Sequence, residues 1–301
     1  MAGPLIVVDA PSLMYRSFFA LPKSIRGADG KPVNALLGTA NALLAAWRER
    51  KPRALVCCWG AEAAKYRVKL YPRYHADRPP MPPALKRQWK LAPEFFEAFG
   101  WPSLDAGQLE ADDLIGSLVA AEEKAGGRTL IFSGDRDMFQ CVSAKTRQLY
   151  PARGGVELIG VKDVRERTGV RPAQVPDLIA LRGDPSDGIP GARGVGEKGA
   201  AELLERHRDL EGVITAAQDP TSGMAAGTRE AILDQAGQLR DFLEIATLQP
   251  VKVRRPRDRK LSEAKAARKA QEMGMARLAE RLTGGETTFR LSGPAAQRRK
   301  G

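Results

Sequence analysis

Three short apolar segments, separated by stretches with helical periodicity, constrain the fold of this chain more than any other feature. Each apolar segment has the length of a buried strand, and the stretches between them carry apolar residues at i, i+4 spacing, as at Leu114 and Leu118. Strands that alternate with helices predict an α/β fold with a mostly parallel sheet covered by helices on both faces. The apolar segments are Leu5–Ala10, Ala54–Trp59 and Thr129–Asp135, and the first two helical patterns cover Ser12–Ala20 and Ala35–Arg48.

Carboxylates stand where the first and third of these strands end. Ligands of parallel sheets bind beyond the carboxyl ends of the strands, so the sequence predicts an acidic site there. Taken singly, any of these aspartates could be a helix cap or a turn residue. Glu110 and Asp113 share a helix face, which Asp112 joins only if the start of that helix is irregular. The four acidic clusters are Asp9; Glu110, Asp112 and Asp113; Asp135 and Asp137; and Asp184 and Asp187.

Eight carboxylates in one cleft would raise one another's pKa, and divalent cations would remove that conflict. Ligand sets made only of oxygen favour magnesium or manganese over zinc. Two such ions roughly 4 Å apart form the arrangement used for in-line phosphodiester displacement. The residues therefore predict metal-dependent phosphodiester chemistry.

The charge of the chain is concentrated near its end. The formal net charge is +12, and residues 251–301 hold 15 Lys and Arg against 5 Asp and Glu, whereas residues 1–250 hold 33 against 31. A basic end favours a polyanion such as nucleic acid, although a solvated tail would have the same composition. The chain has no apolar run long enough to cross a membrane, and its three cysteines form no disulfide or zinc pattern. We therefore expect a cytoplasmic protein.

Proline, glycine and charge mark the remaining organisation. Four prolines between Pro79 and Pro83 predict an irregular connection. Two short helical stretches flank a glycine-rich turn between Pro172 and His207, and a basic helical segment follows from about Pro256. We expect the polar tail from about Gly293 to be disordered.

The chain resembles the 5′ nuclease domain of bacterial DNA polymerase I and the phage-type flap endonucleases. The segments VDAPSLMYR, LEADD, GDRD and GDPSDGIPGARGVGEKGA carry this resemblance in order and spacing, over about residues 4–250. It implies a PIN-like 5′ nuclease core over residues 1–170, with an arch-equivalent segment at 71–92. A helix–hairpin–helix-type DNA-binding region would cover 171–250, followed by a basic helical segment over 251–292 that packs on the core, and a tail over 293–301.

The resemblance also implies roles for individual residues. All eight carboxylates would bind two or three Mg²⁺ or Mn²⁺ ions, with Asp9, Asp112, Asp135 and Asp184 central to catalysis. Arg16 would approach the substrate phosphate. The hairpin would grip the duplex backbone, since its glycines let amides approach phosphates, and would hold K⁺ on its carbonyls. The residues matched to DNA-binding positions of the family are Tyr15, Arg16, Arg67, Arg78, Gly191, Gly194, Gly196 and Lys198.

Two positions depart from the family pattern. Gly60 stands where the second strand of the family usually ends in a metal-binding Asp, and we expect Glu62, two residues on, to be a surface residue. His75 replaces the usual Lys of the arch. His75 and Asp77 could together hold an extra surface metal ion, although an exposed His beside an exposed Asp is the simpler interpretation.

These features predict a standalone structure-specific 5′ nuclease, acting as 5′→3′ exonuclease and flap endonuclease on DNA with 5′ ends, flaps or nicks, in replication or repair. Loss of the Asp at position 60 leaves open a catalytically silent DNA-binding protein, and the acidic α/β core leaves open a PIN-like ribonuclease. We expect a monomer associated with the nucleoid.

Overall fold

A six-stranded sheet forms the centre of the molecule in the computed structural model, which describes residues 3–284. The strand order is β3-β2-β1-β4-β5-β6, and all neighbours are parallel except β5 and β6. The predicted α/β class with a mostly parallel sheet is confirmed. The strands are β1 (Leu5–Asp9), β2 (Ala54–Trp59), β3 (Ser103–Asp105), β4 (Thr129–Phe132), β5 (Thr146–Ala152) and β6 (Gly155–Ile159).

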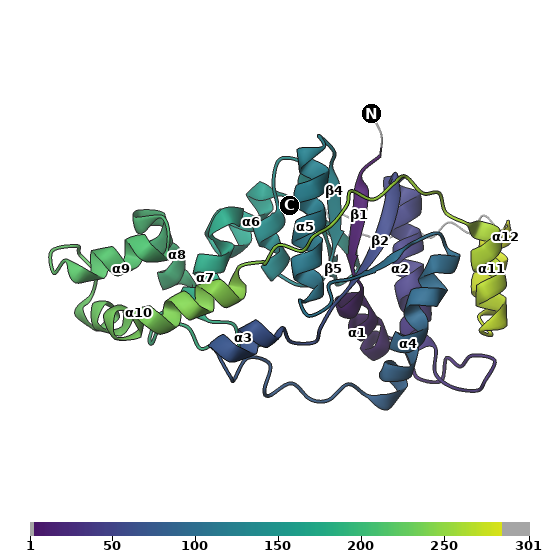
Figure 1. The fold of residues 1–301 in the computed structure, drawn as a ribbon, viewed down its shortest axis with the longest axis horizontal. Helices are drawn as coiled ribbons and strands as arrows, with labels where there is room; N and C mark the ends of the chain where they lie inside the picture. Colours follow the sequence, from purple (N-terminus) through teal and green to yellow (C-terminus); the bar gives the residue numbers. More distant parts are fainter. Residues whose placement is uncertain (1–2, 285–301) are drawn as a thin grey trace, which may run out of the picture.

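Helices cover both faces of the sheet and extend beyond it at both ends (Figure 1). The helices around the sheet are α1 (Ala10–Ala20), α2 (Asn34–Arg50), α3 (Lys65–Leu70), α4 (Pro83–Ala98), α5 (Ala111–Lys124) and α6 (Val161–Thr168). A helical region follows with α7 (Val175–Arg182), α8 (Glu197–His207), α9 (Leu210–Gln218) and α10 (Ala226–Ala246), and the chain returns to the core in α11 (Glu263–Glu272) and α12 (Ala276–Thr283). Two short 3₁₀ helices lie at Asp137–Cys141 and Pro172–Gln174.

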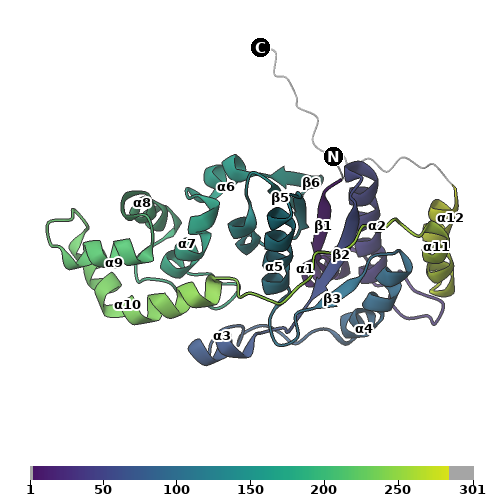
Figure 2. The ribbon, with the colours of Figure 1, turned by 45° about the horizontal axis from the view of Figure 1, so that its top comes forward.

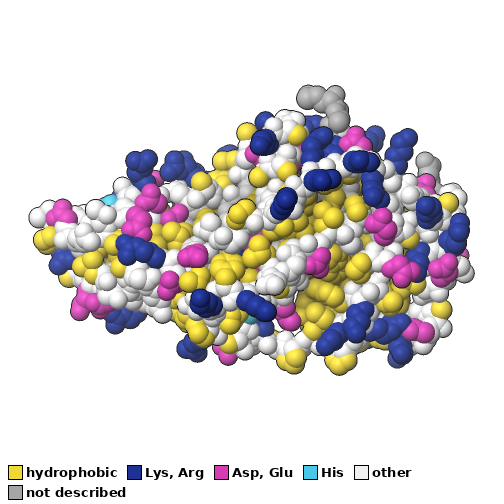
Figure 3. Space-filling view, viewed as in Figure 1, with side chains coloured by type: hydrophobic (Ala, Val, Ile, Leu, Met, Phe, Trp, Pro, Cys, Tyr) yellow, Lys and Arg dark blue, Asp and Glu magenta, His cyan; other side chains and the backbone are white. Residues whose placement is uncertain are grey.

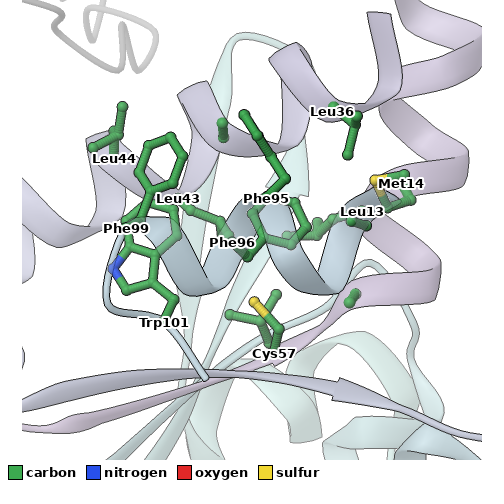
Figure 4. Close-up of a cluster of buried hydrophobic side chains, with 14 of the residues drawn as sticks. Leu13, Met14, Leu36, Leu43, Leu44, Cys57, Phe95, Phe96, Phe99 and Trp101 are labelled. Atoms are coloured by element: carbon green, nitrogen blue, oxygen red, sulfur yellow. The ribbon is translucent and has the colours of Figure 1, made fainter. Parts of the chain in front are cut away.

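Successive residues of β1 and β2 point to opposite faces, and both faces are apolar because both are covered. Ile6 and Val8 face a core built with α1, α2 and α4, whereas Leu5 and Val7 face α5. On the first face the aromatic rings of α4 and Trp101 interlock, with the centroids of Phe99 and Trp101 4.6 Å apart (Figure 4). This double coverage holds the carboxyl ends of the strands, and the residues that follow them, in fixed positions.

The helices between residues 170 and 246 form a second core, which also includes Phe139, Ile159 and Val164 from the preceding part of the chain. Side chains of α7, α8, α9 and α10 pack together, with Phe242 fully buried among them. Figures 1 and 2 both place this helical region at one end of the molecule, with α11 and α12 at the other end and the sheet between them. The loop that carries Asp184 and Asp187 connects α7 to α8, and Asp187 lines the same cleft as Asp9 and Asp135.

The segment between α10 and α11 crosses the core without regular secondary structure. Buried Glu122 of α5 accepts hydrogen bonds from Arg53 and Arg255, and the Arg259 amide donates to the Arg53 carbonyl over 2.9 Å. Ala266 and Leu278, from α11 and α12, are then buried in the core beside α4. Residues 251–284 are thus part of the packed structure, and within this described part of the predicted helical segment the helices cover Glu263–Glu272 and Ala276–Thr283.

Lys and Arg side chains gather at the upper right of the face in Figure 3, near the segment that Figure 1 shows crossing from α10 to α11. Lys252, Arg254, Arg257 and Lys260 of this segment are exposed. The predicted tail over 293–301 lies outside the described residues. Within residues 3–284 no helix has both the length and the apolar character needed to cross a bilayer.

Candidate active site

Asp9 links the first strand to the first helix at the centre of the site. It ends β1 and caps α1, since one carboxylate oxygen accepts the Ser12 amide over 3.0 Å. The other oxygen accepts the Ser133 hydroxyl over 2.6 Å. Asp9 is 3% exposed, and its burial raises the pKa of the carboxyl despite these hydrogen bonds. A buried carboxylate that remains charged here needs a cationic partner.

The loop after β4 brings a second pair of carboxylates to Asp9. Gln148 of β5 donates to the carbonyls of Ser133 and Asp135 over 2.9 and 2.7 Å, which fixes the loop. Asp135 accepts the Asp137 amide over 2.9 Å. Burial and then the negative charges of Asp9, Asp187 and Asp184 raise the pKa of Asp135 to about 6, against the hydrogen bond that lowers it.

Asp112 enters the same group from the first turn of α5. Burial raises its pKa well above the ordinary value, followed by repulsion from Asp9, Asp135 and other carboxylates. The pKa of Asp137 is raised in the same way, first by burial and then by Asp135 and Asp187. Four carboxylates from three separate elements therefore destabilise one another's charged forms.

Asp113 points away from this group, and the prediction that it ligates metal is not supported by its contacts. Its side chain is fully buried. One oxygen accepts from Arg67 over 2.8 Å and from the Gln249 amide over 2.8 Å, and the other accepts from Arg67 over 2.9 Å and from the Glu110 amide over 3.0 Å. A carboxylate has about four lone-pair sites, and all four are used. Asp113 is placed as a positioning residue.

Arg67 is buried beneath the site, which corrects its predicted position on the path of the 5′ end. The residue is 3% exposed, and besides Asp113 it lies 3.1 Å from Glu110 and donates to the Ile245 carbonyl at the end of α10 over 2.9 Å. With every group of its guanidinium turned inward, Arg67 joins α3, α5 and α10. It is not available to contact DNA in this arrangement.

Glu110 lies between the acidic residues around Asp9 and the buried pair of Arg67 and Asp113. It caps α5, and its carboxylate accepts the Ala64 amide over 2.7 Å and the Tyr74 hydroxyl over 3.0 Å. It also lines the cleft beside Asp112. The structure therefore leaves Glu110 within reach of the cleft, but its oxygens are already hydrogen-bonded.

The loop between α7 and α8 supplies the last two carboxylates. Asp184 and Ile189 exchange two backbone hydrogen bonds of 2.8 Å, and the Asp184 side chain accepts from the amide and hydroxyl of Ser186. Asp187 accepts from His75 over 3.1 Å and from Arg78 over 2.7 Å. Burial alone would raise the pKa of Asp187, but these two partners outweigh it and hold the pKa below its ordinary value.

His75 does not form the predicted surface metal site with Asp77. Its side chain is only 5% exposed, with one ring nitrogen 2.9 Å from the Glu62 carbonyl and the other 3.1 Å from Asp187, and its ring stacks on Tyr74 at 3.9 Å. Asp77 is exposed, and no hydrogen bond joins it to His75. The imidazole therefore contacts the carboxylate of Asp187, which also accepts a hydrogen bond from Arg78.

The cleft itself has a volume of about 570 Å³. Its polar lining includes Asp9, Glu110, Asp112, Asp135 and Asp187, while Tyr15, Met81 and Trp89 form an apolar side. Arg78 and the predicted surface residue Glu62 lie at the same cleft. The buried, mutually repelling oxygen ligands fit divalent cations, although residues 3–284 contain no group of three or more acidic, His or Cys side chains already gathered closely enough to hold one.

Gly60 is closed to a side chain by the backbone of the α5 start. A Cβ at this position would lie 2.5 Å from the Leu109 carbonyl oxygen and 2.6 Å from the Ala111 nitrogen. The neighbouring Ala61 amide donates to Leu109 over 2.8 Å, which keeps the two segments together. Substitution of Gly60 by the Asp of the family is therefore sterically blocked.

The remaining predicted DNA-binding residues lie on α1, in the loop before α8 and in the first turn of α8. Tyr15 is half-buried and Arg16 is exposed on α1. Gly194 has φ +72° with open space around it, whereas Gly191, with φ +70°, is packed against Gly183. The hairpin therefore needs a glycine at position 191 for packing as well as conformation. Gly196 caps α8, and Lys198 in its first turn is exposed, with its ammonium 3.9 Å from the Glu202 carboxylate.

Comparisons with known proteins decide the family. Residues 4–169 match the 5′-3′ exonuclease N-terminal resolvase-like domain, and residues 170–272 match the 5′-3′ exonuclease C-terminal SAM fold. The chain belongs to the 5′-3′ exonuclease family. A 5′-3′ exonuclease of Mycobacterium tuberculosis is 36% identical over 86% of this chain and 89% of its own length. DNA polymerase I of Thermus thermophilus is 38% identical over 70% of this chain and 25% of the longer protein.

Solved structures share the fold at lower identity. T5 5′-exonuclease with bound divalent metal ions (zinc) is 17% identical, with a TM-score of 0.66 over 93% of this chain and 98% of that one. The catalytic core of Rad2 in complex with DNA substrate is 13% identical, with a TM-score of 0.63 over 93% of both chains. At these identities the likeness shows the 5′-3′ exonuclease fold.

Two features of the site were missed by reasoning from the sequence. The role of Arg67 as a buried partner of Asp113 depends on residues 46 positions apart, and no local pattern distinguishes it from a surface cation. The apolar side of the cleft uses Trp89, whose place in a helix with an apolar stripe is equally typical of core packing. The four prolines, three before α4 and one at its first residue, were the available signal for where this helix starts.

Proposed function

We propose that this protein is a metal-dependent, structure-specific 5′ nuclease that hydrolyses DNA phosphodiesters as a 5′→3′ exonuclease and flap endonuclease. The observation that carries the proposal is the group Asp9, Asp112, Asp135 and Asp137. Burial raises the pKa of all four, and repulsion from neighbouring carboxylates adds to this at Asp112, Asp135 and Asp137, so their charged forms need cations that a phosphodiester nuclease would use.

Asp9, Asp112, Asp135, Asp137 and the Asp184–Asp187 loop would hold two or three Mg²⁺ or Mn²⁺ ions, with Glu110 at the edge of the set. Bound there, divalent cations would lower the pKa of water and neutralise the charge that builds on the scissile phosphate. Oxygen ligands support magnesium or manganese as the ions. The carbonyls of the hairpin at 188–196 are the proposed K⁺ site.

Other side chains would orient the metal ligands and supply cations to the phosphates of the substrate. Ser133 and Ser12 fix the orientation of Asp9, and Gln148 fixes the loop of Asp135, so these ligands need little reorganisation. Arg78, 41% exposed at the mouth of the cleft, offers a cation to a phosphate once Asp187 engages a metal. Arg16 and Lys198, both exposed, supply further phosphate contacts.

Relatives named as 5′-3′ exonucleases and DNA polymerase I support DNA with 5′ ends, flaps or nicks as the substrate. A catalytically silent DNA-binding protein is disfavoured, because an acidic cleft without metals would repel phosphate. A ribonuclease is disfavoured by the hairpin, which suits a duplex backbone. We further propose that the protein acts as a monomer in the cytoplasm, in association with the nucleoid.

The deciding experiment compares labelled 5′-flap, nicked-duplex and single-stranded RNA substrates in magnesium, manganese or EDTA. We expect 5′-phosphate products from the two DNA substrates with either metal and none in EDTA. Asp112→Asn serves as the matched inactive variant. DNA binding without cleavage in both metals would support the silent binder, and cleavage of RNA alone would support the ribonuclease.

A further inference from the structure

The cleft has two chemically different sides, and the proposed metal chemistry uses only one of them. Tyr15 from α1, Trp89 from α4 and Met81 from the segment before α4 form the other side. All three are partly buried and pack against the main core. A cleft lined both by carboxylates and by apolar rings suits a molecule that is anionic at one end and flat and apolar at the other. A nucleotide has this form.

Trp89 is held in place by two aromatic neighbours, neither of which is stacked parallel to its indole. Its centroid lies 5.0 Å from that of Trp59 at an interplanar angle of 72°, and 6.0 Å from that of Tyr15 at 77°. Both contacts are edge-to-face, and no aromatic ring among residues 3–284 lies parallel to Trp89. Its rotamer is therefore restricted before any ligand binds.

The helix that carries Trp89 is itself anchored. The preceding residue, Gln88, is fully buried, and its side-chain oxygen accepts the amides of Ala35 and Leu36 at the start of α2 over 2.8 and 3.2 Å. Its side-chain nitrogen donates to the Asn34 side chain over 3.1 Å. This contact supplies the acceptor that the first turn of α2 lacks from its own cap. Trp89 therefore stands on a rigid helix.

We propose that Trp89 is a stacking platform for the base of one unpaired nucleotide whose phosphate faces the carboxylates, an inference that rests on the proposed nuclease function. A volume of about 570 Å³ is on the scale of a small-ligand site and suits one nucleotide. Stacking accepts every base, because each has a π-face, but favours those with the larger ring area. Trp89 thus gives the enzyme a preference for a purine at this nucleotide.

The test is a thermodynamic cycle between the indole and the base. A 5′-flap DNA is prepared as a series with one abasic residue at successive positions around the junction. Each is titrated in magnesium against the Asp112→Asn protein, which binds without cutting, and against Asp112→Asn with Trp89→Ala. We expect one position at which base removal weakens binding roughly 5- to 150-fold (about 1–3 kcal/mol), with a loss of similar size from Trp89→Ala. At that position the two changes together should cost no more than either alone.

Two further variants separate stacking from a structural role. Trp89→Phe keeps a smaller aromatic face and should recover part of the affinity and of the purine preference. Trp47→Phe changes a tryptophan that packs on Trp101, away from the cleft, and should leave both unchanged. Thermal unfolding of each variant shows whether the fold is retained.

The proposal is overturned if Trp89→Ala and base removal weaken binding independently at every position, so that their fold-losses of affinity multiply. It is also overturned if folded Trp89→Phe keeps the full purine preference. Failure of the nuclease proposal looks different. In that case the wild-type protein with magnesium leaves the flap DNA uncut, whereas failure of the stacking proposal leaves cutting intact without dependence on the base.

Discussion

Two adjacent aspartates, Asp112 and Asp113, should respond to the same substitution in opposite ways. Asp113 is fully buried against Arg67, and each of its oxygens accepts from two donors. In Asp113→Asn the side-chain NH₂ replaces one of these oxygens, so its two N–H groups face two other donors whichever way the amide is oriented. Breaking a buried ion pair typically costs about 3–5 kcal/mol, which lowers the melting temperature by on the order of 10 °C at this chain length.

Asp112→Asn removes a charge that burial and repulsion already disfavour. The metal-free variant should therefore melt at the wild-type temperature or above it, while flap cleavage is lost. The assay is thermal unfolding with EDTA and with magnesium, alongside flap cleavage at a temperature where both variants are folded. Asp113→Asn should keep substantial activity there, because the carboxylate holds α5 in place and does not touch the metals. If Asp113→Asn melts within about 2 °C of the wild type but is inactive, Asp113 is a ligand and this reasoning is wrong.

Three further predictions follow from the site and the hairpin. Asp135 has a folded-state pKa of about 6, above its ordinary value, so its ionisation should lower the stability of the metal-free protein as pH rises from about 4 to above 6. Magnesium should therefore raise the melting temperature more at pH 7 than at pH 5. An equal magnesium effect at both pH values would contradict this prediction. Gly60→Asp should lower the melting temperature without tightening magnesium binding by calorimetry, because the new Cβ would meet backbone atoms at 2.5 Å. Gly194→Val should cost about 1–2 kcal/mol from its positive φ and weaken nicked-duplex binding in a filter assay, with magnesium affinity unchanged; full duplex affinity would remove the hairpin from the interface.

The strands and the first helices were predictable because their signals are local. The apolar run of β2 covers the predicted residues, Ala54–Trp59, and the helix predicted over Ala35–Arg48 forms as Asn34–Arg50. Asp9 and the loop of Asp135 lie where the carboxyl ends of parallel strands must bring them. Short apolar runs and the topology of a parallel sheet were sufficient to predict the positions of these carboxylates.

The divergence of Glu110, Asp112 and Asp113 was not predictable from their spacing. Their directions depend on Arg67 and on the Gln249 amide, 136 residues from Asp113. The same limit applies to His75, whose contact with Asp187 joins residues 112 positions apart. Burial of α11 against α4, and of α12 in the same core, likewise depends on a crossing segment whose composition, rich in Lys and Arg, is typical of a solvated surface.

The close contact at Gly60 bears on how such a site can change over time. The carboxylate normally expected at the end of β2 cannot return by a single substitution, because the start of α5 occupies its place. A reversion would first have to move the backbone at Leu109–Ala111, which also sets the positions of Glu110 and Asp112. A carboxylate at position 60 therefore requires a displaced start of α5, and the cleft residues on that turn would be displaced with it.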